Sequence, residues 1–379
     1  MKNNTLANRR KIRGDHFLKY GELIRQSIQS AAQSSPYRHY LYIRKRVLEM
    51  MDEMQSHAEN LPSDYWKEEL SGMDYMFDAS PLIIERLREH CYHLTGIRAY
   101  DYRQHHIHRK KIFAQKLKML QQQDNAGLLS PENPTLGGFG YSINDSLYNL
   151  DTLKYYECLI ALNKAGILDS IPTQLHKKSI VMEIGAGWGG FAYQFKTHFP
   201  NTTYIIIDLP PTLLFSAVYI KTLFPSAKVF VYGDEPLTAL FDNLVVYDFV
   251  FLPHYLINEL QIENINLIIN LVSFQEMTSE QVEAYVKRAA KLKCQHLYSL
   301  NRNRSRHNPQ LTTVRSIIDK YYESLEIRVL DMAYVDLPKY APKNSSVIAR
   351  VGSRLKSLVK KRTGRHSDYR YRHIVGTLK

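Results

Sequence analysis

The chain has 379 residues, of which 44% are hydrophobic and 23% charged, so it can bury a core in one elaborated domain or in two domains. An excess of Lys and Arg gives a formal net charge of +13, which favours anionic partners such as nucleotides, phosphorylated sugars, nucleic acid or an acidic membrane surface. Its three cysteines, Cys91, Cys158 and Cys294, exclude a disulfide framework, and none has the C-x-x-C spacing of a structural zinc site. No apolar stretch resembles a signal peptide or a membrane-spanning helix, so we expect a cytoplasmic protein.

Residues 1–123 are predicted to form an α-helical N-terminal region that acts as a lid, as an acceptor-binding element or as the surface of a homo-oligomer. Apolar residues recur at steps of three and four from Phe17 to Ile28 and from Tyr40 to Met54, the period of one helical face. A third helix is expected over Pro81–Leu94, with Ser80 as its N-cap and proline at the first helical position.

Residues 124–149 are rich in Gly, Pro and Asn and are predicted to be a connecting loop. Just before them, His105, His106 and His108 lie among Arg and Lys side chains. Such a crowd of positive charge disfavours a cation and favours phosphate, so no metal site is expected.

From residue 150 to residue 351, short β-branched segments alternate with helical ones. The expected strands are Ser179–Ile184, Thr203–Asp208, Lys228–Tyr232, Asp248–Leu252, Asn266–Val272 and Gln295–Leu300. The expected helices are Asp151–Lys164, Gly190–Phe199, Pro211–Phe224, Ser279–Lys293 and Pro309–Tyr322. This alternation predicts an α/β fold with a doubly wound, Rossmann-like, mostly parallel sheet.

Two further strand candidates, Glu326–Asp331 and Ser345–Val351, are separated by a loop only, which predicts an antiparallel terminal hairpin at the sheet edge. Residues 352–379 are then a basic C-terminal tail, expected to be solvated and to make at most peripheral contact with a membrane.

The strongest local signal is the sequence Glu183-Ile-Gly-Ala-Gly-Trp-Gly-Gly190, because it follows a strand and opens a helix. Glycines there permit a tight turn and let a ligand approach the backbone. The next strand ends in Asp208, which can accept hydrogen bonds from both hydroxyls of an adenosine ribose. These features fit either NAD or S-adenosylmethionine (SAM).

Glu183 favours SAM over NAD. Glu183 is at the buried end of the strand, where an ionised carboxylate without a partner destabilises the fold by roughly several kcal/mol. The ammonium at the methionine end of SAM gives this carboxylate a partner, whereas dinucleotide-binding proteins usually keep the position apolar. The large Trp188 inside the loop also suits a ligand without a pyrophosphate.

Four segments together resemble the sugar O-methyltransferase family, which has the class I SAM-dependent fold. They are the glycine loop, Tyr204-Ile-Ile-Ile-Asp-Leu-Pro210, Phe251-Leu-Pro-His254 and Ile269-Asn-Leu-Val-Ser-Phe-Gln-Glu-Met277. The resemblance extends upstream to His90-Cys-Tyr-His-Leu-Thr-Gly96 and the Gly137-Gly138 loop, and so covers roughly residues 80–350. It implies a SAM-dependent O-methyltransferase whose acceptor is a sugar hydroxyl on a glycan or nucleotide-sugar. The acceptor can be phosphorylated, nucleotide-linked or neither.

The predicted cofactor residues are Glu183, Gly185, Ala186, Gly187, Trp188, Gly189, Asp208, Leu209 and Asp234. Asp234 ends a strand as an acid near the adenine does in many enzymes of this fold, but the strand ending at His254 competes for that place. A sugar hydroxyl needs a general base, for which Glu276 is the first choice and His254 the second. The predicted acceptor-binding residues are Ser273, Gln275, Asn301 and Arg302.

Two other functional classes stay open on the sequence. An RNA methyltransferase would use the net positive charge and the 27 tyrosines, but the chain has no Asn-Pro-Pro-Tyr type motif and no appended RNA-binding module. An NAD(P)-dependent oxidoreductase is disfavoured by Glu183 and by the lack of a Tyr-x-x-x-Lys pair. We therefore expect no nucleic-acid partner.

Overall fold

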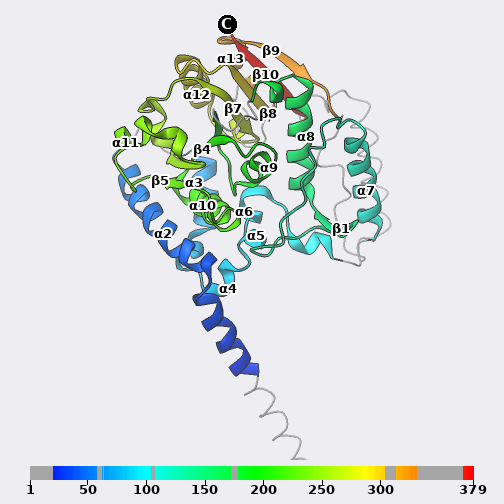
Figure 1. The fold of residues 1–379 in the computed structure, drawn as a ribbon, viewed down its shortest axis with the longest axis vertical. Coiled ribbons are helices and arrows are strands. Elements are labelled where there is room, and N and C mark those ends of the chain that lie inside the picture. Colours follow the sequence, from blue (N-terminus) through cyan, green and yellow to red (C-terminus); the bar gives the residue numbers. More distant parts are fainter. Residues whose placement is uncertain are drawn as a thin grey trace, which may run out of the picture.

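The structure is a computed structural model that describes residues 20–57, 62, 64–103, 107–171, 178–303, 313–330 and 370–379. An eight-stranded sheet runs through the body of the molecule in the order β5-β6-β4-β3-β7-β8-β10-β9 (Figure 1). Its strands are β3 Ser179–Ile184, β4 Thr202–Asp208, β5 Val229–Val231, β6 Phe249–Pro253, β7 Ile265–Leu271, β8 His296–Arg302, β9 Tyr322–Ile327 and β10 Tyr371–Leu378. Neighbours from β5 to β8 are parallel, and β10 is antiparallel to both β8 and β9. The predicted α/β fold, a doubly wound and mostly parallel sheet, is confirmed.

Side chains along the parallel strands alternate between two apolar layers, one on each face of the sheet. Val181, Tyr204 and Ile206 face the layer that contains α8 (Leu150–Lys164), α9 (Gly190–His198) and α10 (Pro210–Leu223). Met182 and Ile205 face the layer that contains α11 (Leu237–Asp242), α12 (Ser279–Lys291) and α13 (Val314–Ile318). With both faces covered, the carboxyl ends of the strands form the edge at which such folds bind ligands.

The end of the sheet differs from the prediction. The expected strand Glu326–Asp331 overlaps β9 by two residues only, since β9 is Tyr322–Ile327, and the helix expected to reach Tyr322 ends at Ile318 as α13. The partner expected at Ser345–Val351 lies outside the described residues. The strand that pairs with β9 is β10, from the segment predicted to be a solvated tail, and it is inserted between β8 and β9. Buried Ile374 and Val375 explain its place in the sheet.

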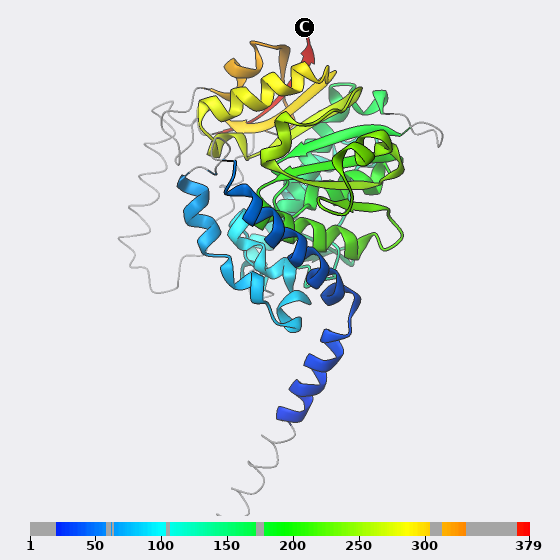
Figure 2. The same cartoon turned by 90° about the vertical axis from the view of Figure 1, so that its left-hand side faces the viewer.

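The N-terminal region is helical, as predicted; most of its helices lie together at one end of the molecule (Figure 2), and the helix over residues 107–121 lies beside α8 (Figure 1). Its principal helices are α2 Ser35–Met54, α3 Asp64–Ser71 and α7 Ile107–Gln121, with 3₁₀ turns at Asp74–Asp78 and Ala99–Tyr102. A helix over residues 20–32 projects away from the body in both views. α2 packs along α10, where His39 Nδ1 lies 3.2 Å from Thr222 Oγ1.

The helix predicted over Pro81–Leu94 is interrupted. It forms three short pieces, α4 Pro81–Ile84, α5 Leu87–His90 and α6 Tyr92–Thr95. At the first break the backbone of Arg86 has ψ of 24°, and the Arg88 N–H donates to the carbonyl of Leu136 at 2.9 Å. Gly137 packs so closely that an added Cβ would lie 2.9 Å from the Arg86 Cα. The connecting loop therefore breaks the helix by tertiary contact.

Residues 124–149 connect the two regions and carry a small hairpin, β1 Tyr141–Ile143 with β2 Ser146–Tyr148. Asn149 then caps α8 through a capping box with Thr152. In the described part of the chain, no helix has the length and apolar composition needed to cross a membrane.

A fully buried guanidinium joins the N-terminal region to the sheet domain. Arg88 on α5 donates to Glu132 Oε1 at 2.7 Å and to Asp151 Oδ2 at 2.8 Å. Its guanidinium carbon also lies 3.7 Å from the ring centroid of Trp188. Glu132 is held in addition by Asn149 at 2.9 Å. Removing one partner from a buried ionic group of this kind leaves a charge uncompensated.

Arg88→Met keeps much of the side-chain volume but leaves Glu132 and Asp151 without the guanidinium. We expect the free energy of unfolding to fall by about 3–5 kcal/mol in denaturant titrations. The matched control is Arg86→Met, because the Arg86 side chain is 68% exposed, and it should change stability by about 0.5 kcal/mol or less. Equal stabilities of the two variants would contradict the structural role of Arg88.

Candidate functional site

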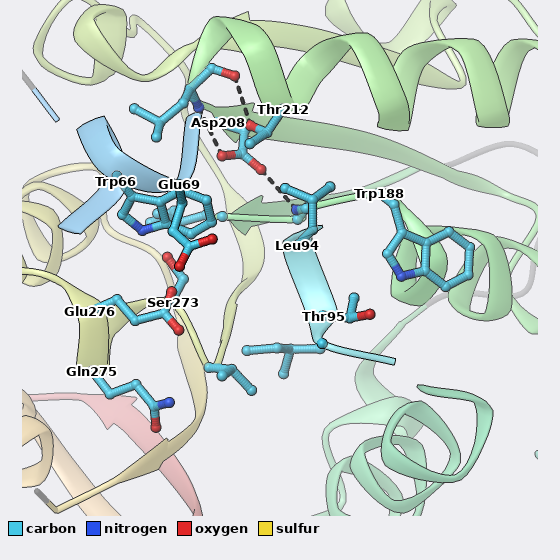
Figure 3. Close-up of a pocket in the computed structure, with 18 of the residues that line it drawn as sticks. Trp66, Glu69, Leu94, Thr95, Trp188, Asp208, Thr212, Ser273, Gln275 and Glu276 are labelled. Carbon is cyan, nitrogen blue, oxygen red and sulfur yellow. Dashed lines mark hydrogen bonds between the residues drawn. The ribbon is translucent and has the colours of Figure 1, made fainter. Parts of the chain in front are cut away.

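One cavity of about 660 Å³ lies over the carboxyl ends of the parallel strands. The N-terminal region covers it: Trp66 and Glu69 come from α3, and Leu94 and Thr95 from α6 (Figure 3). In the close-up, Trp66, Glu69, Ser273, Gln275 and Glu276 lie on one side of the cavity, and Thr95 lies toward the other. The site is thus built jointly by the helical region and the sheet.

The glycine loop forms the floor of the cavity because its backbone is tightly turned. Gly185 and Gly187 have positive φ angles of 74° and 58°, in the left-handed region that side chains rarely adopt. At Gly185 an added Cβ would also lie 2.3 Å from Ser273 Oγ. Only glycine therefore lets the loop after β3 and the loop after β7 approach each other at this point.

Glu183 lies at the end of β3 with 1% of its surface exposed, and it lines the cavity. Tyr204 Oη donates to its Oε2 at 2.9 Å. Burial raises the pKa of Glu183 to about 8, although the hydrogen bond from Tyr204 opposes the rise. Without a cationic ligand the carboxyl is therefore protonated at neutral pH, and a bound cation would restore its charge.

Asp208 ends β4 beside the glycine loop. Its Oδ2 accepts from the Gly187 N–H and its Oδ1 from the Leu209 N–H, both at 2.8 Å (Figure 3). Burial raises its pKa to about 6, against the hydrogen bonds from Thr212 and the backbone. Asp208 also lines the cavity, so a donor on a bound ligand, such as a hydroxyl, can approach its carboxylate.

Trp188 serves the core more than the cavity. Its ring is 2% exposed, its Nε1 donates to Asp151 Oδ2 at 3.2 Å, and it packs edge-on against Tyr219. An added Cβ on Gly190 would lie 2.2 Å from the Trp188 ring. Trp188 still lines the cavity, but with little of its surface, because the side chain turns into the protein.

The loop after β7 presents three polar side chains to the cavity, Ser273, Gln275 and Glu276. Val272, which starts the loop, has a positive φ of 70°, a strained conformation for a β-branched residue. Strain of this kind is typical of functional loops that the surrounding structure holds in place.

Asn301 holds this loop from below. Its Oδ1 accepts from the Gln275 N–H at 3.1 Å and its Nδ2 donates to Asn270 Oδ1 at 2.9 Å. The Gln275 Oε1 in turn accepts from the Arg302 N–H at 3.0 Å. Asn301 is buried and does not line the cavity, so its predicted contact with an acceptor is replaced by a supporting role.

Glu276 lines the cavity on the same side as Glu69 (Figure 3). Burial raises its pKa to about 8; Lys154 and Arg302 oppose the rise, and the charge of Glu69 adds to it. A carboxyl of this kind is protonated at neutral pH and becomes a base of useful strength as the pH approaches 8.

Of the two candidates for the place near the adenine, His254 lines the cavity and Asp234 does not. β6 lies next to β4, and Pro253 is in register with Asp208, so His254 reaches the cavity beside Asp208. β5 lies one strand further out. Asp234, after β5, does not line the cavity: it is bonded by Tyr42 and, at 3.2 Å, by Arg46 Nε, both on α2. The assignment of Asp234 to the adenine is therefore not supported.

Of the remaining predicted site residues, some line the cavity and one does not. Ala186, Leu209 and Arg302 line the cavity. Arg302 lies with its guanidinium carbon 4.4 Å from the Tyr371 ring centroid. Gly189 lies behind the loop, where an added Cβ would meet Ser216 and Ile220 of α10.

The sequence predicted a lid or an acceptor-binding element in the N-terminal region, but it did not identify which residues of that region, or of α8, line the cavity. Tyr65, Trp66 and Glu69 on α3 line the cavity, as does Lys154 on α8. The segment Tyr92–Arg98 also lines it, and part of that segment carried the family resemblance. α3 carried no comparable signal. Across the described ranges, no group of three or more His, Cys, Asp or Glu side chains is arranged to hold a metal ion.

Several solved structures show a weak likeness to this chain at low identity. The WbdD chain solved with the kinase inhibitor LY294002 is 13% identical with a TM-score of 0.33; the match covers 62% of this chain and only 42% of that one. The methyltransferase domain of bacterial CtHen1 is 11% identical over 61% of this chain and 100% of that one, with a TM-score of 0.36. Geranyl diphosphate methyltransferase, solved with SAM, is 11% identical over 68% and 95%, with a TM-score of 0.36.

Likenesses this distant say nothing about the ligand or substrate of this chain. Neither a protein-family model nor a curated protein matches the sequence.

Glu183→Gln should stabilise the ligand-free protein at alkaline pH. The wild-type carboxyl ionises near its ordinary pKa of 4.5 when unfolded but near 8 when folded, so wild-type stability falls as the pH rises between these values. Glutamine can still accept from Tyr204 and does not ionise. We expect the difference in Tm between variant and wild type to grow from pH 5 to pH 8, by roughly 2–4 °C per kcal/mol relieved.

Glu280→Gln, at an exposed position on α12, is the matched control and should show no such trend. A Tm difference for Glu183→Gln that stays constant between pH 5 and pH 8 would show that Glu183 is ionised in the folded protein.

Proposed function

We propose that the chain is a SAM-dependent O-methyltransferase whose acceptor is a sugar hydroxyl. The observation that carries the proposal is Glu183, a buried carboxyl with a raised pKa that faces the cavity beside the glycine loop. A carboxyl in this state gains most from a cationic ligand, because the ligand compensates a charge that the protein otherwise suppresses. The ammonium of SAM supplies such a cation.

The adenosine half fits the neighbouring strand ends. Asp208 is oriented by two backbone N–H groups and lines the cavity, which supports a role in accepting from the ribose hydroxyls. His254 lines the cavity beside Asp208, which supports a contact with the adenine. β6 and β7 are separated by β4 and β3, which puts His254 about 14 Å from the loop of Glu276 at about 4.8 Å per strand. This separation favours His254 as a cofactor contact and Glu276 as the base.

The opposite wall suits a sugar. A sugar ring offers apolar C–H faces and hydroxyl edges, which match a wall made of aromatic rings and carboxyls. Tyr65 and Trp66 supply the rings, and Glu69 and Glu276 the carboxyls (Figure 3). The sugar O-methyltransferase resemblance of residues 269–277, which include Glu276, supports the same acceptor class.

The protein's part in the reaction is to position the acceptor and to take its proton. When bound, SAM supplies a methyl group already activated by its sulfonium. Glu276 removes the hydroxyl proton as the acceptor oxygen forms its bond to the methyl carbon and the carbon–sulfur bond breaks. Gln275 and Ser273 hold neighbouring hydroxyls, and α3 with α6 excludes water from the reacting atoms.

Isothermal calorimetry should detect binding of SAM and S-adenosylhomocysteine and no binding of NAD. Because Glu183 must lose a proton to bind the ammonium, affinity for S-adenosylhomocysteine should rise roughly tenfold per pH unit between pH 6 and pH 8. Glu183→Gln should bind more weakly and with little pH dependence. NAD binding in the cavity would contradict the proposal and favour an oxidoreductase.

Glu276→Gln should lower methyl transfer by roughly 10²–10⁴-fold, the usual contribution of a general base, without changing affinity for S-adenosylhomocysteine. The wild-type rate should rise with pH toward a plateau above about pH 8, because the base must be ionised. The assay is transfer of labelled methyl from SAM to nucleotide-sugar, lipid-linked and polysaccharide fractions, with RNA as a comparison acceptor. His254→Ala serves as a control that should act mainly on cofactor binding.

A further inference from the structure

Lys154 is a cation on the cavity wall that neither the sequence motifs nor the proposed mechanism uses. It lies one turn into α8, lines the cavity, and has a side chain only 16% exposed. Its Nζ donates to Asp151 Oδ1 at 3.0 Å and lies 4.8 Å from the Tyr155 ring centroid. Because Asp151 orients Lys154 at the wall of the cavity, its ammonium is available to bind an anionic group of a ligand.

The ammonium has capacity beyond its bond to Asp151. Lysine carries three donors, and the hydrogen bond to Asp151 uses one of them. Asp151 also accepts from Arg88 and Trp188, so its negative charge is shared among three donors. The Asp151 carboxylate therefore orients the Lys154 ammonium but does not fully compensate its positive charge.

The charge of Lys154 acts in the part of the cavity that holds Glu183. Lys154 and Glu183 line the same cavity, and the charge of Lys154 opposes the rise that burial causes in the pKa of Glu183. Lys154 acts on Glu276 in the same sense. Arg302, by comparison, acts on Glu276 and lies against Tyr371 on the strand side of the cavity.

A carboxylate and an ammonium on the wall of one cavity, here Glu183 and Lys154, match the two charged groups of an α-amino acid. The ammonium and the carboxylate of an α-amino acid are attached to the same carbon. We propose that Lys154 binds the α-carboxylate of SAM while Glu183 binds its ammonium. This inference rests on the proposed function, because it assigns the second charged group of the same cofactor. It makes Asp151 a positioning residue for Lys154, and through Arg88 it ties cofactor binding to the buried ion network.

The experiment compares ligands that differ in the carboxylate alone. Calorimetry is done on the full chain with SAM and with decarboxylated SAM, for wild type and Lys154→Met. We expect Lys154→Met to weaken SAM binding roughly 10- to 100-fold, the effect of one hydrogen bond between charged groups. Decarboxylated SAM keeps the ammonium and the sulfonium, so its affinity should change less than about threefold, within the spread of a near-neutral substitution. Lys154→Arg should recover part of the SAM affinity.

Lys164→Met, at an exposed position on the same helix, is the matched control and should leave both affinities unchanged. Equal SAM affinity for Lys154→Met and wild type would overturn the inference. So would an equal loss for both ligands, which would mean that Lys154 only supports the fold; thermal unfolding of each variant checks this. If wild type binds neither SAM nor S-adenosylhomocysteine, the proposed function itself fails, and the inference fails with it.

Discussion

The buried ion network around Arg88 is the constraint on which the rest of the structure depends. A guanidinium with no exposed surface is stable only where carboxylates and hydrogen-bond acceptors surround it. Glu132 comes from the connecting loop, Asp151 from α8, and Arg88 from the interrupted helix of the N-terminal region. Three segments far apart in the chain must therefore assemble together, and the N-terminal helices are fixed to the sheet domain by charge as well as by apolar packing.

The same network reaches the floor and the wall of the cavity. Trp188 lies against the Arg88 guanidinium and donates to Asp151, which anchors the glycine loop from behind. Asp151 also holds Lys154 at the cavity wall. Because α3 and α6 cover the opposite side, the cavity exists only when the helical region is docked. The N-terminal region is thus a structural part of the site, which accords with a role in enclosing the cofactor and contacting the acceptor.

Electrostatics give the cavity its chemical preference. Burial raises the pKa of Glu183, Asp208 and Glu276 to about 8, 6 and 8 respectively, so Glu183 and Glu276 are largely protonated at neutral pH unless a cation lies beside them. A cationic ligand group beside Glu183 favours its ionised form. The chain as a whole has a net charge of +13, but this excess of cations is not found in the cavity. Its lining includes five acids and three Arg or Lys side chains: Glu69, Asp151, Glu183, Asp208, Glu276, Arg98, Lys154 and Arg302.

The sequence alone determined the sheet domain. The parallel strands are buried on both faces, so their sequences are largely apolar. Glu183, Asp208 and Glu276 were identifiable because each lies at, or just beyond, the carboxyl end of such a strand. β10 was not identifiable, because Tyr371–Leu378 follows a basic segment and gains its strand pairing from β8 and β9, distant in the chain. The same limit applies to Asp234, Asn301 and Lys154. Whether an acid at a strand end meets a ligand or another helix depends on strand order and on which helix docks beside it, and such long-range contacts leave no local pattern in the sequence.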